Sequence, residues 1–307
     1  MTEVAERTEL ITSGPAEALA GLLGVPMPDL DAGQGLPLLW HWLYLLERPP
    51  QAAMGTDGHP AHGGIPSPPG PGRRRMFAGG RITQHAPLRI GAAATRRTWE
   101  ASSAEKHGRS GALLFVTVRS EISQGSRLVI AEEQDIVYRD SAAAPAGPPE
   151  AGPPRDASCR DSPPRDASRR DSPPRDSTPR DSASREQAAA DARDWPVTVD
   201  PVLLFRFSAL TYNSHRIHYD RDYARQVEGY PGLVVHGPLQ ALLMAELARR
   251  VTSLPASCEY SFRLVAPLFE GQGLIVSAAV SADMTHMMTR DAAGRQTAAG
   301  TIGPARP

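Results

Sequence analysis

The residues whose types and spacing most clearly suggest chemistry lie between positions 203 and 243 of this 307-residue chain. Side chains that can carry or share a proton gather in one short polar stretch, at Tyr212, Asn213, His215, His218 and Asp220. His236 and Gly237 follow, directly before an apolar run that predicts a helix. An imidazole can take or give a proton near neutral pH, and free N–H groups at a helix N-terminus stabilise negative charge on an oxygen. These groups together predict acid–base chemistry on a carbonyl compound.

Adding water to an enoyl thioester, or removing it, is a reaction that needs such a set. A base must activate water, an acid must protonate the α-carbon, and a donor must stabilise enolate-like charge on the thioester oxygen. His218 is the candidate acid or base. Gly237 is the candidate donor, since glycine also lets a thioester approach the backbone closely. Arg206 could bind a substrate carboxylate or a coenzyme A phosphate, as could Arg74 or Arg75, or it could lie on a solvated face.

Several of these residues also have a purely structural interpretation. His215 could hydrogen-bond within a turn, and Asp220 is of a type that is common in turns and at helix N-caps. His236 could be a buried hydrogen-bonding residue. If residues 217–219 were a strand, His218 would face the polar set while its two neighbours faced the other way.

Regular patterns on both sides of this stretch indicate how it is positioned. Residues 14–23 predict a short helix, and the apolar, aromatic run 36–46 fits either a helix or a strand. A strand within 197–207 is predicted to enter the site, a short helix to span 222–228, and a longer helix to span 238–251. Runs of β-branched and aromatic residues predict antiparallel strands over residues 81–91, 95–104, 111–122, 128–138, 259–266, 274–280, 286–290 and 296–302.

The chain divides into two similar halves around a low-complexity segment. Pro-Pro-Arg-Asp-Ala-Ser begins at 153 and again at 163, and Pro-Pro-Arg-Asp-Ser begins at 173. Such a segment buries too little apolar surface to offset its ordering entropy, so 141–194 is predicted to be a disordered linker between units 1–140 and 195–307. Ala-Pro-Leu occurs at 86 and at 266, each time between strand-like runs, which indicates two related α+β units.

Composition excludes several classes of function. A formal charge of −1 gives no support to binding of nucleic acid or of a membrane surface. No apolar run approaches the roughly 20 residues that span a bilayer, and the acidic N-terminus is not a targeting peptide, so a cytoplasmic protein is expected. Cys159 and Cys258 lie far apart in unlike contexts, which argues against a disulfide. His59 and His62 resemble metal ligands only superficially, and neither a metal nor a redox cofactor is predicted.

Two stretches of the sequence carry a resemblance to a known family. FRFSALTYNSHRIHYDRDYA (Phe205 to Ala224) and YPGLVVHGPLQALL (Tyr230 to Leu243) are similar to the MaoC-like, hydratase-2 branch of the hotdog superfamily, and most of all to its two-hotdog group. LPLLWHWLYLLE from Leu36 and RRMFAGGRI from Arg74 extend the resemblance over most of the chain. It implies an α+β double hotdog, in which each unit is a long helix wrapped by an antiparallel sheet. Since hotdog sheets usually pair, the halves are expected to form a pseudo-dimer or to associate further as a homodimer.

The family motif Asp-x-Asn-Pro-x-His can be placed on this sequence residue by residue. The resemblance makes Asn213 and His218 the catalytic dyad and Gly237 the oxyanion glycine. Further candidates, for binding the substrate, are Tyr212, His215, Arg206 and His236. Asn213 stands where the motif has Asp, and an amide cannot act as a base. His218 would then work alone or with another partner, such as His215, Tyr212 or Asp220.

The resemblance implies an acyl-CoA hydratase or dehydratase, with a C4-dicarboxylic thioester such as mesaconyl-C4-CoA as substrate and citramalyl-CoA as product. One alternative is a dehydratase for 3-hydroxyacyl chains on acyl carrier protein. Another is a non-catalytic acyl-thioester-binding subunit, which the Asn213 departure motivates. A thioesterase is a further alternative, because the hotdog fold also supports hydrolysis.

Overall fold

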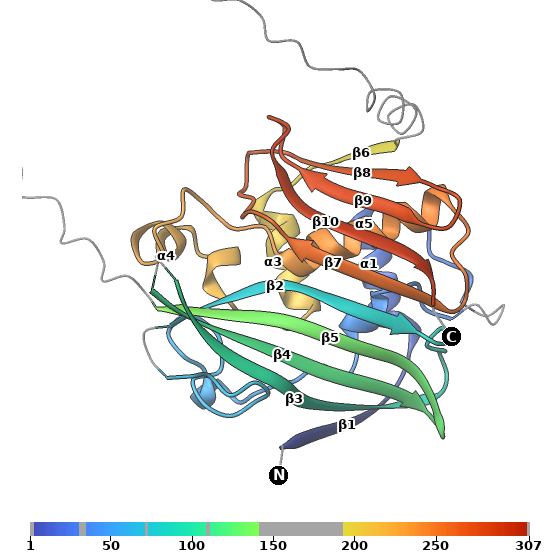
Figure 1. Ribbon diagram of the computed structural model, residues 1–307, viewed down its shortest axis with the longest axis horizontal. Helices are drawn as coiled ribbons and strands as arrows, with labels where there is room; N and C mark the ends of the chain where they lie inside the picture. The colour runs from blue at the N-terminus through green and yellow to red at the C-terminus, as the bar shows by residue number, and fades with distance from the viewer. Residues whose placement is uncertain (1–2, 31–34, 71–72, 109–110, 141–192, 306–307) are drawn as a thin grey trace, which may run out of the picture.

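The computed structural model describes residues 3–30, 35–70, 73–108, 111–140 and 193–305. Within these residues the strands form one antiparallel sheet in the order β1-β3-β4-β5-β2-β7-β10-β9-β8-β6 (Figure 1). The predicted repeat segment lies outside the described residues. The boundaries of the two units therefore stay a prediction.

The first half of the sheet is built from the N-terminal residues. Its elements are β1 (Val4–Leu10), α1 (Ser13–Leu23), η1 (Trp40–Leu43), η2 (Gln51–Ala53), β2 (Arg73–Gln84), β3 (Ala93–Gly108), β4 (Gly111–Gln124) and β5 (Arg127–Asp140). The elements of the second half are β6 (Arg193–Val197), α3 (Pro201–Leu210), η3 (Arg216–His218), α4 (Arg221–Gln226), α5 (Gly237–Val251), β7 (Cys258–Leu264), β8 (Leu274–Val280), β9 (Thr285–Arg290) and β10 (Gln296–Pro304).

The two halves have the same strand topology. In each, an edge strand (β1 or β6) pairs with the second strand of a four-strand set, and the first strand of that set pairs with the fourth. The first strands, β2 and β7, pair with each other and join the halves, with Gly80 opposite Phe262. The Ala-Pro-Leu echo follows both of them, and Ala86 and Ala266 each donate a 3.2 Å hydrogen bond to the matching strand. The predicted internal repeat is confirmed at the level of topology.

The central helix differs between the halves. Leu36 N donates to Leu88 O and Val235 N donates to Leu268 O, both at 2.8 Å, so the segments after residues 36 and 235 occupy matching positions. After residue 235 the chain forms α5, which lies behind the curved strands β7 to β10 and is buried along most of its length (Figure 1). After residue 36 it forms only the 3₁₀ turn η1. The described part of the first half therefore has no long helix at this place.

The predicted strand within 197–207 is wrong, because most of this segment is helix α3. Asp200 caps the helix by accepting a 2.7 Å hydrogen bond from Leu203 N, and Pro201 has no N–H to leave unpaired in the first turn. Leu204 and Phe207 are buried on one side, while Phe205 is 59% exposed. The spacing of buried residues is that of a helix, although the run of apolar residue types had suggested a strand.

The other predicted helices and strands are found with shifts at their ends. The strand predicted from residue 81 begins earlier, at Arg73, and the strand predicted over 274–280 matches β8. No helix in the described part of the chain is long and apolar enough to span a bilayer. Cys258 is a buried free thiol, and burial raises its pKa to about 11; Cys159 lies outside the described residues.

Candidate active site

His218 lies at the end of the 3₁₀ turn η3, not on a strand as one interpretation of the sequence required. Its Nδ1 is 2.8 Å from the backbone oxygen of Val234. A carbonyl can only accept, so Nδ1 carries the hydrogen and Nε2 keeps its lone pair when the ring is neutral. Nε2 makes no hydrogen bond within the described residues. It is nevertheless accessible to solvent, because the buried unpaired atoms among these residues do not include it. The ring is thus fixed at one nitrogen and available for proton transfer at the other.

His236 packs directly against this ring. The centroids of His218 and His236 are 3.6 Å apart, with the ring planes 20° from parallel. His236 is completely buried, and its Nε2 is 2.8 Å from Ser208 Oγ on α3. The structure therefore supports the interpretation of His236 as a buried hydrogen-bonding residue, one that positions His218.

Gly237 follows His236 and is the first residue of α5. The N–H groups of the first helical turn have no partner inside the helix, so the Gly237 N–H is available to an external acceptor. A Cβ at this position would lie 2.2 Å from Leu264 Cδ1 and 3.1 Å from Phe77 Cδ1. Phe77 belongs to β2 and Leu264 to β7, so this helix start sits where the two halves meet, and a Cβ there would require Leu264 or the helix start to shift.

The side-chain oxygen of Asn213 is hydrogen-bonded within its own turn. Its Oδ1 accepts a 3.1 Å hydrogen bond from His215 N and thereby closes the turn before η3. Tyr212, with φ of 52° and 53% exposure, and the exposed Arg206 on α3 lie on the outside of the same turn and helix. Asp220 caps α4 by accepting from Tyr223 N at 3.0 Å. The structure thus groups His215, His218, His236 and Gly237, and leaves Tyr212 and Arg206 outside this group.

A loop from the first half of the chain packs against the site stretch, which the sequence did not predict. Ser214 Oγ donates to Gly58 O at 2.7 Å, and Arg216 N donates to Asp57 O at 2.9 Å. Gly58 has φ of +88°, and a Cβ there would lie 1.9 Å from Ser214 O. Backbone of the two segments is therefore in direct contact, and this contact needs a glycine.

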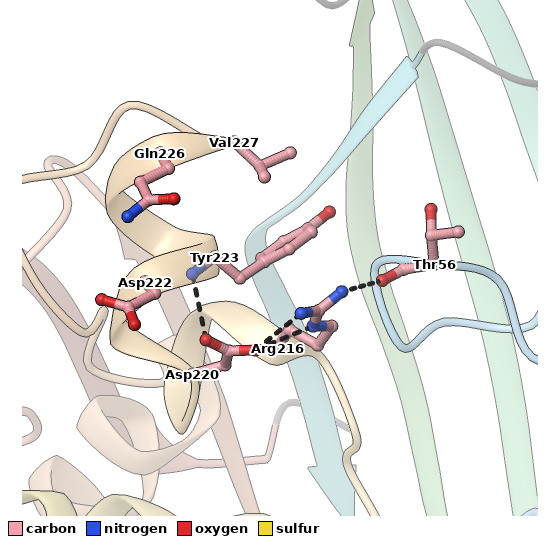
Figure 2. Close-up of a pocket in the computed structure, with 7 residues that line it drawn as sticks. All are labelled: Thr56, Arg216, Asp220, Asp222, Tyr223, Gln226 and Val227. Carbon is pink, nitrogen blue, oxygen red and sulfur yellow. Dashed lines mark hydrogen bonds and ion pairs between the residues drawn. The ribbon is translucent and has the colours of Figure 1, made fainter.

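The outer side of this contact forms an open pocket, lined by Thr56, Arg216, Asp220, Asp222, Tyr223, Gln226 and Val227 (Figure 2). Arg216 spans it, with Nη1 3.0 Å from Thr56 O and Nη2 2.7 Å from Asp220 Oδ2. The guanidinium also lies 4.1 Å from the centroid of the Tyr223 ring. Since the cation is already paired, Arg216 serves to hold the loop in place.

The loop brings Asp57 and His59 to the imidazole of His215. His59 Nδ1 is 3.2 Å from Asp57 Oδ2, and the His59 and His215 ring centroids are 4.1 Å apart. The His215 ring lies in turn 5.5 Å from that of His218. One ligand atom from each of Asp57, His59 and His215 falls within 4.8 Å of the others, a spacing that could hold a divalent cation. His59 was singled out in the sequence without these partners.

The imidazoles of this group are neutral at pH 7. Burial, with a smaller contribution from neighbouring imidazoles, lowers the pKa of His215 to about 2 and that of His218 to about 4. Burial also lowers the pKa of His59 and of His236, and the positive charge of Arg75 lowers the pKa of both His59 and His215. A fixed cation beside His59 and His215 favours an anion at this place over a metal ion.

A second buried polar cluster lies in the first half, and the sequence analysis missed it. Glu132 on β5 is buried and accepts from Trp42 Nε1 at 2.8 Å, while His41 Nε2 lies 3.1 Å from its other oxygen. Burial opposes ionisation of Glu132, yet hydrogen bonds from His41, Gln134 and Trp42 keep its pKa below the usual value. The alternation of strand β5 could have drawn attention to a carboxylate on its inner face. The cluster ties η1 to the sheet.

Comparisons with known proteins agree with this architecture. A family model described as hydroxyacyl-thioester dehydratase type 2 matches residues 39–169 and 163–270. The chain is 48% identical over 256 residues to mesaconyl-C(4)-CoA hydratase of Chloroflexus aurantiacus. The aligned region covers 83% of this chain and 79% of that protein.

Solved structures show the same fold. HtdX of Mycobacterium tuberculosis has a TM-score of 0.61 at 16% identity, covering 99% of this chain and 100% of that chain. A conserved hypothetical protein of the same organism, described as a double hotdog fold, has a TM-score of 0.50 at 17% identity over 99% and 96% of the two chains. The predicted α+β double hotdog is confirmed, except that the long helix expected in each unit is present only in the second half of the described residues.

Proposed function

Because the chain belongs to the hydroxyacyl-thioester dehydratase type 2 family, we propose that it adds water to the double bond of mesaconyl-C4-CoA and forms citramalyl-CoA. The chain is a hydro-lyase acting on acyl thioesters, as the family and its 48% identical relative are. The choice of substrate rests on that relative. The observation that carries the chemistry is His218, whose Nδ1 is held by Val234 O while Nε2 has no hydrogen-bond partner among the residues that the structure describes.

In the proposed reaction the thioester oxygen accepts a hydrogen bond from the Gly237 N–H, at the positive end of α5. Nε2 of His218 removes a proton from water as the water oxygen bonds to the β-carbon, and the double-bond electrons move onto the thioester oxygen. The enolate then collapses, and its α-carbon takes the proton back from His218. One water is added in total, and His218 returns to its starting state.

Asn213 has a different role in this proposal from that of the motif carboxylate. Its side-chain oxygen holds the turn through His215 N, so it positions the imidazoles and takes no proton. The low pKa of His218 keeps its ring neutral at pH 7, so Nε2 has the lone pair that the reaction needs, and the protonated ring gives the proton back readily. A single neutral imidazole can therefore both accept and return the proton, which keeps an altered motif compatible with turnover.

A spectrophotometric hydration assay of the purified chain tests the proposal. Mesaconyl-C4-CoA, crotonyl-CoA and medium-chain 3-hydroxyacyl thioesters on coenzyme A and on acyl carrier protein form the panel. Turnover of mesaconyl-C4-CoA that His218→Ala abolishes is the expected result. Preference for a saturated medium-chain hydroxyacyl carrier protein would select the dehydratase alternative, and thioester binding without any turnover would select a non-catalytic subunit. Homodimer formation stays a prediction, which analytical ultracentrifugation tests.

A further inference from the structure

The proposed substrate has a second anionic group in a defined place. In mesaconyl-C4-CoA the free carboxylate is attached to the β-carbon, the atom to which the water oxygen bonds. Whatever binds this carboxylate must therefore lie beside the base that activates the water. Arg206, one candidate from the sequence, is exposed on α3 and lies away from His218, because the helix turns Leu204 and Phe207 inward instead.

Arg75 occupies a better place for this task. It lies on β2 opposite the buried Tyr138, two residues before Phe77. Side chains two residues apart on a strand share a face, so Arg75 is on the same face as Phe77. The Phe77 ring is one of the two side chains that would meet a Cβ at Gly237. The face of β2 that carries Arg75 is therefore the one turned toward the start of α5.

The charge of Arg75 acts inside the imidazole group. Its guanidinium lowers the pKa of His59 and of His215, and also that of Tyr138 against the larger effect of burial. Its neighbour Arg74 is neutralised by Glu228 at 2.9 Å. Within the described residues Arg75 has no such carboxylate partner, although it is half-buried. A half-buried cation beside neutral imidazoles is a site for an anion from outside the chain.

His215 and His59 complete the surroundings of the Arg75 guanidinium. The ring nitrogens of His215 have no partner in the described part of the chain, yet they are not closed off from solvent. The neutral ring therefore has one N–H to donate. His59 is held against it by Asp57 and by the Gly58–Ser214 contact. The His59 and His215 ring centroids are 4.1 Å apart, and the His215 centroid lies 5.5 Å from that of His218.

We propose that Arg75, together with His215 and His59, forms the binding site for the free carboxylate of a dicarboxylic acyl thioester. The inference rests on the proposed function and adds to it the residues that select the substrate class. The thioester oxygen is held at Gly237, the β-carbon lies at His218, and the carboxylate lies at Arg75. The loop carrying His59 thus contributes to specificity from the other half of the chain.

The test compares substrates with and without the carboxylate. Arg75→Gln should lower kcat/KM for mesaconyl-C4-CoA about 10- to 100-fold, through KM, which is the range for loss of a charged hydrogen bond. Crotonyl-CoA, which has a methyl group in place of the carboxylate, should change less than about twofold by the same reasoning, since it makes no such bond. Arg75→Lys should recover part of the loss. Arg81→Gln, a 51% exposed arginine on the same strand, is the control and should leave both substrates unaffected.

A binding measurement separates this inference from the proposed function. Succinyl-CoA and butyryl-CoA differ in the same group and need no turnover, so their affinities are measured by calorimetry. Wild type should prefer succinyl-CoA, and Arg75→Gln should remove the preference. Equal losses for both substrate classes, or no loss for either, would overturn the inference while hydration by the wild type stands. A wild type that hydrates neither enoyl thioester contradicts the proposed function, and the two affinities still decide the role of Arg75.

Discussion

The imidazole of His218 stacks on that of His236 with 3.6 Å between centroids, and His236 is the residue directly before Gly237. The stack joins the proposed base to the proposed oxyanion donor through one rigid side chain. Ser208 Oγ holds the far edge of His236, so α3 contributes to the alignment as well. Small changes in this packing should therefore appear as changes in rate.

The first prediction concerns the base itself. His218→Ala should lower kcat about 10²- to 10⁴-fold, the usual contribution of a general acid or base. KM should change little, because the ring is not proposed to bind the thioester. Steady-state kinetics on mesaconyl-C4-CoA measure this, with His62→Ala as a control at an exposed loop position. If His218→Ala retains more than about a tenth of the activity, the loss is far smaller than 10²-fold, and His218 is not the general base.

The start of α5 gives a second prediction. Gly237→Ala places a Cβ 2.2 Å from Leu264 Cδ1, so the helix start or the side chain must move. We expect a loss of stability of about 1–3 kcal/mol, typical of overpacking, and a larger loss of kcat/KM than this stability change alone would cause. Thermal denaturation and kinetics measure the two effects. Gly21→Ala, at an exposed position of α1 with nothing within 4 Å, should instead stabilise by about 0.5–1 kcal/mol.

The contact between the loop and the site stretch gives a third prediction. Gly58→Ala and Gly63→Ala both put alanine at positive φ, but only the first meets an atom, Ser214 O at 1.9 Å. Both substitutions carry the strain of a positive φ. The additional destabilisation of Gly58→Ala relative to Gly63→Ala, about 1–3 kcal/mol, therefore measures the contact with Ser214. KM for the dicarboxylic substrate should rise only in Gly58→Ala. Equal effects of the two substitutions on stability and KM would contradict the proposed role of the loop.

Stability should depend on pH through the buried imidazoles. An unfolded histidine has a pKa of about 6.5, whereas burial lowers the pKa of His218 to about 4 and that of His215 to about 2. Below pH 6.5 the unfolded chain binds protons that the folded chain does not, so stability is complete above that pH and is lost as the pH falls toward 4. Denaturant midpoints at pH 7.5, 6 and 5, chosen to bracket the unfolded value of about 6.5, should decrease in that order. His218→Asn should show a shallower decrease.

Asn213 gives a fifth prediction, which separates positioning from proton transfer. Asn213→Asp keeps an oxygen acceptor for His215 N, so stability should be retained and kcat should change by less than about threefold, well under the effect of losing a base. Asn213→Ala removes the acceptor and should cost about 1 kcal/mol. A large gain of rate in the Asp variant would show that a carboxylate at this position still acts as a base.

Local patterns predicted much of the second half. The helix expected over 238–251 is α5. It is buried along most of its length, as its apolar sequence indicates. The strand expected at 274–280 is β8, where an almost wholly apolar run alternates buried and half-buried residues over most of its length. The same approach gave the wrong prediction for residues 201–210. Its cap at Asp200 and its Pro201 decided for a helix, while the apolar residue types alone favoured a strand.

By itself the sequence determined which residue types could do the chemistry and the order in which they come, since His218 and Gly237 are close in the chain and one turn and one helix start position them. The tertiary structure alone decided what surrounds them. Ser214 and Gly58 are 156 residues apart, and their contact brings Asp57 and His59 to His215. The position of Arg75 beside these rings likewise comes from β2, which sets its side chain on the inner face. Contacts between distant segments depend on how the whole sheet closes around its core, and no short-range pattern records that.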